Sequence, residues 1–267
     1  MTVRETGTYL DRILVRTAET VATSKAAISP AEMARMARAT TPAVPTELSR
    51  EQVTVIAEFK RASPSKGVFP VQIDPESVAN AYIEGGVAAI SCLTDAPFFQ
   101  GSLDDLDAVV ATSASRVPVL RKDFTIDTYQ IDEARAHGAS LILLIVAALD
   151  DAQLREYRLQ AEELGMAALV EVHDEAEAER AVASGASLIG INNRDLRSFV
   201  TDLATTELIA PMLPANTTIV GESGIFTVED VTRMAAVGVD AVLVGESLIL
   251  QQDRAAAVRA LAGVEKR

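Results

Sequence analysis

A recurring pattern of apolar and polar positions runs through most of this chain. In each copy an amphipathic stretch ends at a glycine and is followed at once by a short apolar run. Glycine ends a helix at little cost because it accepts a positive φ, and a continuous apolar run is typical of a buried parallel strand. Each copy therefore predicts a helix followed by a strand. The terminal glycines of the clearest copies are Gly86, Gly138, Gly165, Gly185 and Gly238.

Completing the pattern gives eight strands that alternate with helices. We expect the strands near residues 53–59, 87–93, 117–121, 140–146, 167–171, 187–192, 217–221 and 240–244, with a last helix near 252–262. Because no hairpin signal separates the strands, the sheet should be parallel, and eight such units suit an α/β fold of the (β/α)8 TIM barrel type. A doubly wound sheet is the alternative, but the chain has no G-x-G-x-x-G fingerprint.

About fifty residues precede the first expected strand. Two helices are predicted there, the second opening at Ser29 with Pro30 in its first turn. We expect residues 1–267 to form one domain in which residues 1–48 are an N-terminal helical extension. Its apolar stripe must be buried against one end of the barrel, and the pattern does not show which end. The extension is therefore either a lid over the catalytic mouth or a plug at the bottom. The stripe consists of Leu10, Ile13, Leu14 and Val21.

Polar side chains stand where the expected strands end. In (β/α)8 barrels the active site lies at the carboxyl ends of the strands. One charged residue at a strand end is ordinarily a solvated rim group, whereas so many at the ends of apolar strands predict a functional cluster. The cluster comprises Glu58, Lys60, Lys122, Asp123, Glu171, Asn192, Arg194, Glu222, Ser223 and Glu246.

Two glycines, Gly224 and Gly245, follow the seventh and eighth strands. Barrels of this type often bind phosphate there, because glycine allows close approach and main-chain N–H groups can surround the anion. An isolated glycine would be read as an ordinary tight turn, but here both phosphate-loop positions are filled. The sequence therefore predicts a small phosphorylated substrate.

Composition narrows the class of partner. Of the 267 residues 49% are apolar, so a large core is available, and the net charge is −14. This charge argues against binding to nucleic acid or to an anionic membrane. The longest apolar run, Leu141–Leu149, is shorter than the roughly 20 residues that span a bilayer. Because the N-terminus shows no export signal, we expect a cytoplasmic protein. An anionic substrate must pass a negative surface, so positive potential has to be concentrated at one mouth by Lys60, Lys66, Lys122 and Arg194.

Three other residues with reactive side chains receive no functional role. Cys92 lies on an expected strand without a supporting motif, so we interpret it as a small buried hydrophobic residue. His137 stands at a helix C-terminus and is expected to be structural. His173 follows Glu171, but its direction beyond the strand end cannot be predicted. No spacing of histidine, cysteine and carboxylate indicates a metal, and we expect neither a metal nor another cofactor.

Six motifs carry a resemblance to one enzyme family. They are Ile56-Ala-Glu-Phe-Lys-Arg-Ala-Ser-Pro-Ser-Lys-Gly67, Leu93-Thr-Asp-Ala-Pro-Phe-Phe-Gln-Gly-Ser102, Leu120-Arg-Lys-Asp-Phe124, Leu169-Val-Glu-Val-His173, Ile189-Gly-Ile-Asn-Asn-Arg-Asp-Leu196 and Val220-Gly-Glu-Ser-Gly-Ile225. In this order the chain resembles indole-3-glycerol phosphate synthase over about residues 9–250. The resemblance implies a (β/α)8 barrel with an N-terminal extension over the catalytic mouth. It also implies closure of the indole ring of 1-(2-carboxyphenylamino)-1-deoxyribulose 5-phosphate, with release of CO₂ and water, in tryptophan synthesis.

The resemblance also implies roles for the residues that carry the chemistry. The anthranilate ring carbon attacks the substrate ketone, so an acid must protonate that oxygen as charge develops. Lys122 would be this acid and Glu171 would act in dehydration. Lys60 would be a partner cation, for substrate anions or for the second acid step. Glu58 and Glu222 would orient and tune the ammonium groups.

The remaining implied residues would bind the substrate. Asn192 and Arg194 suit its carboxylate and hydroxyls. The family's hydroxyl and phosphate positions match Ser223, Gly224, Gly245 and the main chain at Glu246, with Ser63 bordering the loop. An apolar slot for the aromatic ring would consist of Phe99, Phe124, Leu143 and Leu196, although each of these could instead be plain core.

One departure from the family is visible, because the chain has no tryptophan. A tryptophan contact that the family makes from the extension must be replaced here, and Tyr9 is a candidate.

Two other functions are alternatives. Phosphoribosylanthranilate isomerase, another phosphosugar barrel, would need a cysteine at the end of the first strand, and Cys92 is not there. A phosphometabolite-binding protein without catalysis would need the glycines but not Lys122 or Glu171. We expect the protein to act as a monomer.

Overall fold

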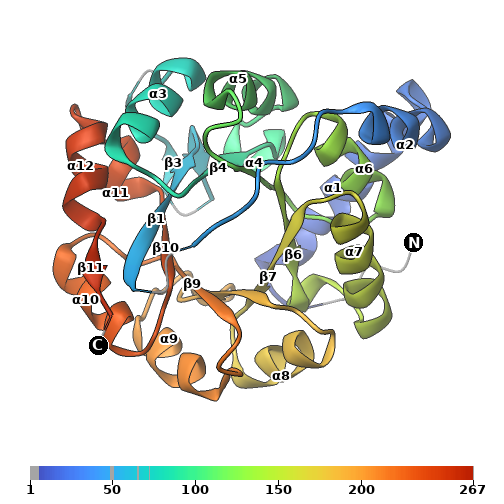
Figure 1. The fold of residues 1–267 in the computed structure, drawn as a ribbon. Helices are drawn as coiled ribbons and strands as arrows, with labels where there is room; N and C mark the ends of the chain where they lie inside the picture. Colours follow the sequence, from blue (N-terminus) through green and yellow to red (C-terminus); the bar gives the residue numbers. More distant parts are fainter. Residues whose placement is uncertain (1–5, 49–50, 65, 72, 267) are drawn as a thin grey trace.

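The computed structural model describes residues 6–48, 51–64, 66–71 and 73–266. Eight parallel strands follow one another around a closed barrel, in which each strand pairs with the next and β1 pairs with β10 (Figure 1). The expected (β/α)8 barrel is therefore confirmed, and a doubly wound sheet is excluded because such a sheet stays open. The barrel strands are β1 Gln52–Phe59, β4 Ala89–Leu93, β5 Val119–Lys122, β6 Leu141–Ile145, β7 Ala167–Val172, β8 Leu188–Asn192, β9 Thr218–Glu222 and β10 Ala241–Val244.

A ring of helices surrounds the strands (Figure 1). All five glycines that were expected to end helices have φ between 79° and 87°, a region that side chains other than glycine rarely adopt. The main helices are α3 Pro75–Gly85, α5 Leu103–Ser113, α6 Thr128–Ala136, α7 Asp151–Glu163, α8 Glu175–Ala183, α9 Ala204–Ile209, α10 Val228–Ala236 and α12 Arg254–Leu261. The short turns are α4 Ala96–Phe99, α11 Glu246–Ile249 and the 3₁₀ helices η1 Val146–Ala148 and η2 Ala210–Met212.

Three short strands were not predicted. Strands β2 (Ala62–Ser63) and β3 (Gly67–Val68) form a small hairpin in the loop after β1. Strand β11 (Val264–Glu265) pairs antiparallel with the first residues of β1. Each has two residues, which is too few for a period-2 pattern to be recognisable.

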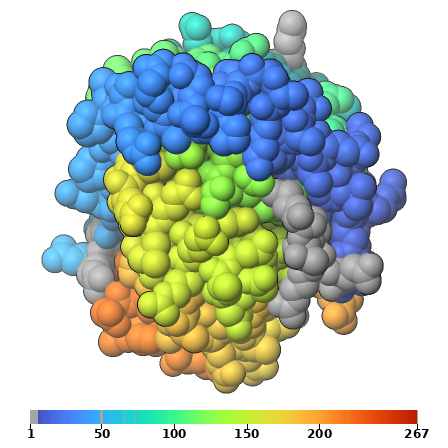
Figure 2. Space-filling view, turned by 90° about the vertical axis from the view of Figure 1, so that its right-hand side faces the viewer, coloured from blue at the N-terminus to red at the C-terminus, as the bar shows by residue number. Residues whose placement is uncertain are grey.

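The N-terminal extension contains two helices, α1 (Tyr9–Ala27) and α2 (Pro30–Ala39). They form a blue band across one face of the molecule, over the green and yellow surface of the following segments (Figure 2). Helix α2 packs along α6. Helix α1 is joined to the start of α6 by an ion pair of 2.6 Å between Lys25 Nζ and Asp127 Oδ2 and by a hydrogen bond from the Tyr129 hydroxyl to the Ser24 carbonyl.

The extension reaches both mouths of the barrel. At the carboxyl ends of the strands, Tyr9, Leu10 and Ile13 line the same pocket as the strand-end residues. At the other side, the segment after α2 crosses the opening on its way to β1 (Figure 1), and the Val44 amide donates a hydrogen bond to Ser140 Oγ, just before β6 begins. The first five residues of the expected extension lie outside the described residues.

Candidate active site

The centre of the site is an ammonium group held between two carboxylates. Lys122 ends β5, and its Nζ lies 2.7 Å from Glu222 Oε2 at the end of β9 and 3.4 Å from Glu171 Oε2 near the end of β7. All three side chains are at most 14% exposed. Alternation along parallel strands directs these side chains into the barrel, and the similar heights of the strand ends bring them to one point.

The charges in this cluster shift one another's pKa values. Burial opposes the charged form of Lys122, but the carboxylates of Glu222, Glu171 and Glu58 outweigh it and hold the lysine pKa above its usual value. Burial also favours the neutral form of Glu171, yet Lys122, His173 and a hydrogen bond with Asn192 keep its pKa well below the usual range. The cluster therefore contains a charged ammonium donor next to an ionised carboxylate.

Glu222 differs from Glu171. Burial raises the pKa of Glu222 to about 7, because neighbouring carboxylates add to the burial effect and Lys122 only partly offsets both. Its Oε1 is buried and has no hydrogen-bond partner among the described residues. A carboxyl group that titrates near neutrality can change the negative charge that Lys122 faces at working pH.

Gly190, which sequence reasoning did not single out, makes room for this carboxylate. A Cβ atom added to Gly190 in the middle of β8 would lie 2.1 Å from Glu222 Oε1. The signal was present in the sequence as a glycine inside a strand pattern, which often marks the close approach of another group.

A second ammonium–carboxylate pair lies beside the first. Lys60 Nζ, just after β1, is 2.6 Å from Glu58 Oε1. Gly245 backs this pair, since a Cβ atom there would lie 2.4 Å from Glu58 Oε1 and 2.8 Å from Lys60 Nζ. Glycine is thus needed after β10 for a reason that the sequence alone did not show. Lys66 extends this positive side, with Nζ 3.4 Å from Glu246 Oε1.

The turn after β9 has an unusual backbone. Ser223 and Gly224 have φ values of 65° and 78°, and the buried side chain of Asn193 donates hydrogen bonds to the carbonyls of Glu222 and Ser223. Asn193 Oδ1 in turn accepts hydrogen bonds from Thr206. Asn193 was not predicted to matter, and it fixes the turn that presents Ser223 and Gly224 to the mouth.

The apolar side of the mouth consists of aromatic and aliphatic residues. The rings of Phe99 and Phe124 are 6.0 Å apart at 36°, and Leu143, which lines the same pocket, is buried. Tyr9 meets Phe98 and Phe199 edge to face at 5.9 and 5.4 Å. Because Tyr9 lines the same pocket, an aromatic ring from the extension does reach the mouth.

The structure brings all sixteen predicted site residues to two adjoining pockets at the carboxyl ends of the strands. The pocket under the extension contains Glu58, Lys60, Ser63, Phe99, Lys122, Phe124, Leu143, Glu171, Asn192, Arg194, Leu196, Ser223 and Glu246. The pocket beside it adds Glu222, Gly224 and Gly245 and shares Lys60 and Lys122 with the first. The second pocket contains the turn glycines, and the first contains the aromatic side chains.

Two of the other residues considered in the sequence, Cys92 and His137, lie outside this site. Cys92 is fully buried on β4, and burial raises its thiol pKa far above the usual value. His137 caps α6, with Nδ1 2.7 Å from Asp107 Oδ1. Within the described ranges, no three histidine, cysteine or acidic residues are arranged to hold a metal ion. No helix in that part of the chain has the length and apolar character that crossing a membrane requires.

Solved structures of low sequence identity share the fold of this chain. It superposes on a 3-hexulose-6-phosphate synthase with a TM-score of 0.61 at 17% identity, covering 78% of this chain and 98% of that one. A thiamine phosphate pyrophosphorylase from Pyrococcus furiosus gives 0.59 at 18% identity, covering 78% and 93%. At such identities the likeness shows the fold alone.

Comparison of sequences is far more specific. The family model for indole-3-glycerol phosphate synthase matches residues 10–261. An indole-3-glycerol phosphate synthase from Mycolicibacterium smegmatis is 49% identical over 253 residues, covering 94% of this chain and 92% of the relative. Another, from Roseiflexus sp., is 46% identical over 258 residues with the same coverage. This chain belongs to the indole-3-glycerol phosphate synthase family, which consists of carboxy-lyases of tryptophan biosynthesis.

Proposed function

We propose that Lys122 and Glu171 carry out the chemical steps by which 1-(2-carboxyphenylamino)-1-deoxyribulose 5-phosphate becomes indole-3-glycerol phosphate, while Glu222 orients and tunes Lys122. The observation that supports this assignment is the position of Lys122 Nζ, 2.7 Å from Glu222 and 3.4 Å from Glu171. In ring closure Lys122 donates a proton to the ketone oxygen while the ring carbon attacks the carbonyl carbon. Loss of CO₂ then leaves its electron pair in the ring and restores aromaticity.

Dehydration completes the reaction. The hydroxyl formed from the ketone leaves as water after it receives a proton, and a base removes the proton whose loss completes the indole double bond. We assign the base to the ionised Glu171. The acid is one of the two lysines, and the adjacent position of Lys60 beside Glu58 suits it for this step or for binding substrate anions.

The remaining residues would bind different parts of the substrate in the two pockets. The phosphate would lie against the main chain of Ser223, Gly224, Gly245 and Glu246, where close approach is possible. The aromatic ring would lie between Phe99, Phe124, Leu143 and Leu196, with Ser63 at the rim. Asn192 lines the first pocket and Arg194 lines both, and these two residues would bind the carboxylate and hydroxyls.

The assignment of Lys122 is tested by kinetics. Lys122→Ala should lower kcat by roughly 10²–10⁴-fold, the usual worth of a positioned general acid, whereas KM should change much less. Lys266→Ala is the matched control, because Lys266 pairs with Asp240 outside the site and its loss should leave both constants unchanged. A change confined to KM would make Lys122 an anion clamp and would contradict the proposal. If the parent protein bound the substrate but formed no product from it, the protein would instead be a binding protein without catalysis.

We also infer that the protein works as a monomer in the cytoplasm. One chain supplies all sixteen proposed site residues, so no second copy is needed to complete the site. A phosphorylated, multiply anionic substrate is retained inside the cell that makes it. Specific activity that is independent of protein concentration, together with a monomer mass in solution, would support this inference.

A further inference from the structure

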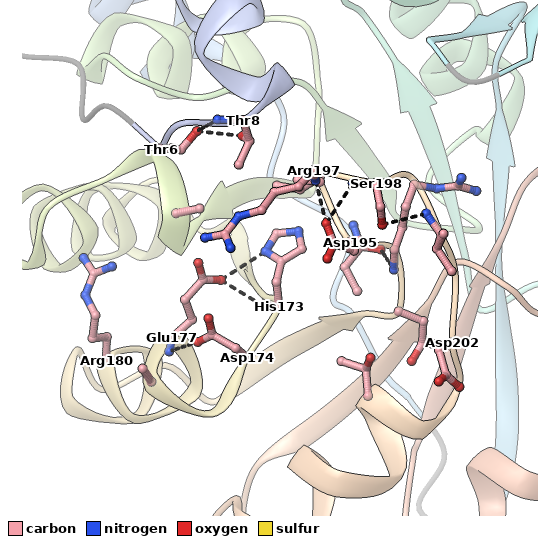
Figure 3. A pocket seen from close by; sticks show the side chains of 18 residues that line it. Thr6, Thr8, His173, Asp174, Glu177, Arg180, Asp195, Arg197, Ser198 and Asp202 are labelled. Carbon is pink, nitrogen blue, oxygen red and sulfur yellow. Dashed lines mark hydrogen bonds and ion pairs between the residues drawn. The ribbon is translucent and has the colours of Figure 1, made fainter.

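The side chain of His173 bridges two carboxylates at the edge of the active site. His173 follows β7, two residues after Glu171. Its Nε2 lies 3.2 Å from Glu171 Oε1, and its Nδ1 lies 3.0 Å from Glu177 Oε2. Figure 3 shows the Glu177 carboxylate meeting both the ring and the main chain of His173. The chain Glu171–His173–Glu177 thus leads from the barrel interior to the cleft of about 790 Å³ drawn there.

The electrostatic surroundings keep this imidazole positively charged. Burial favours the neutral ring, since the side chain is 12% exposed, but the hydrogen bonds and charges of Glu171 and Glu177 outweigh burial and raise its pKa to about 10. Asp195, in the loop after β8, adds a negative charge near the ring. The other charged groups that line the cleft are Asp174 and Arg180 on the α8 side and Arg194, Arg197 and Asp202 on the loop after β8.

We propose that His173 is a positioning residue for catalysis, whose imidazolium orients Glu171 and keeps it ionised while Lys122 is discharged. This inference rests on the proposed role of Glu171. Lys122 and His173 contact different oxygens of the Glu171 carboxylate, Oε2 and Oε1. They therefore fix the plane of the carboxylate between them.

The timing of the reaction makes the second cation important. Once Lys122 has given its proton to the substrate, it no longer offsets the charge of Glu171. Among the described residues, the other cation that forms an ion pair with Glu171 is His173. The His173 imidazolium acts on Glu171 both through the 3.2 Å contact of Nε2 with Oε1 and through its positive charge. A neutral side chain in its place would lack the charge.

A purely structural role explains the geometry less well. The first turn of α8 is capped by Asp174, which accepts from the Glu177 amide, and Glu177 already accepts a hydrogen bond from the His173 main chain. These contacts do not use the imidazole. The ring could thus be replaced while the turn and the start of α8 remain in place.

Two neutral replacements test the proposal. His173→Gln keeps an amide at the distance of Nε2, and His173→Asn keeps one at the distance of Nδ1. Both should lower kcat about tenfold or more, a part of what Glu171 contributes as a general base, with KM within about twofold of the parent value. The acidic limb of the kcat–pH profile should move to higher pH, because loss of a neighbouring cation raises the pKa of Glu171. His137→Asn, the same change at a histidine outside the site, should alter neither.

Glu171→Gln and the double variant Glu171→Gln/His173→Asn separate this inference from the function on which it rests. If His173 acts through Glu171, the double variant should be no slower than Glu171→Gln alone. Circular dichroism melts check that each variant is folded. If His173→Asn does not fold, His173→Gln replaces it in the double variant. A kcat and acidic limb that match the parent in a folded His173 variant would overturn the inference alone. Full activity of Glu171→Gln would overturn the role of Glu171 and the inference with it.

Discussion

Glu222 is held where an ionised carboxylate is poorly tolerated. It is 1% exposed, and one of its oxygens has no hydrogen-bond partner in the part of the chain that the structure describes. Burial and the neighbouring carboxylates raise its pKa to about 7. A group with such a pKa is useful in proton transfer but does not help the protein to stay folded. Stability and activity therefore conflict at this residue.

This conflict predicts a pH-dependent effect of Glu222→Gln. The folded-state pKa of about 7 exceeds the unfolded value of 4.5, so the folded state binds the proton more tightly. The contribution of Glu222 to stability is full below pH 4.5 and is lost as pH rises through 7. Glu222→Gln should therefore raise the free energy of unfolding by roughly 1–3 kcal/mol at pH 8 relative to its effect at pH 5, while kcat falls. Urea unfolding at the two pH values measures this, and an effect of equal size at both would contradict it.

At the level of elements, strand ends were predictable and side chains beyond them were not. Lys122, Glu171 and Glu222 could be assigned to one mouth because alternation and the barrel topology direct strand residues inward. His173 stands after β7, where no periodicity fixes its direction, and the contact with Glu177 that orients it is visible only in the structure. The hairpin of β2 and β3 was missed because strands of two residues have no pattern.

The close approaches could not be predicted for a different reason. Gly190 and Gly245 are needed because carboxylate and ammonium groups from other strands come within 3 Å of where a Cβ atom would be. Such a requirement depends on contacts between residues far apart in the chain. A glycine in a strand signals that something is near it without showing what it is.

The extension has two separable parts, and each should respond to its own substitution. Tyr9 faces the mouth and contacts Phe98 and Phe199. Met33, on α2, is 1% exposed. Tyr9→Ala should raise KM and leave the melting temperature nearly unchanged, because it removes part of the proposed lid. Met33→Ala should destabilise the fold by about 2–5 kcal/mol, the usual loss for such a core truncation, with KM unchanged.

Thermal melts and steady-state kinetics on the two variants separate these effects. If Tyr9→Ala lowered the melting temperature and left KM as it is in the parent, the N-terminal end of α1 would be structural and the lid would be disproved.

The whole molecule repels the substrate that its site attracts. The net charge is −14, while Lys60, Lys66, Lys122 and Arg194 lie around the two pockets or at their rim. The overall field acts over long distances and is screened by salt, whereas the partly buried lysines act at contact and are screened much less.

Moderate salt should therefore help the enzyme. Between about 10 and 150 mM KCl the Debye length falls from roughly 30 to 8 Å, so repulsion at a distance is weakened more than attraction in the mouth. We expect kcat/KM to rise over this range while kcat stays constant. Initial rates at subsaturating substrate measure it, and a steady fall in kcat/KM would show that the local cations dominate the approach of the substrate.

The closure of the barrel has a consequence for how the chain is made. Strand β1 pairs with β10, and the Thr54 hydroxyl donates to the Asp240 carbonyl 186 positions away, while β11 pairs with the first residues of β1. During synthesis β1 emerges well before β10 and β11, so one edge of β1 stays without a neighbour until these strands have been made. Such an unpaired edge can bind other nascent chains. Folding to the closed barrel therefore requires β10 to be made, and termination before β10 leaves an aggregation-prone open sheet.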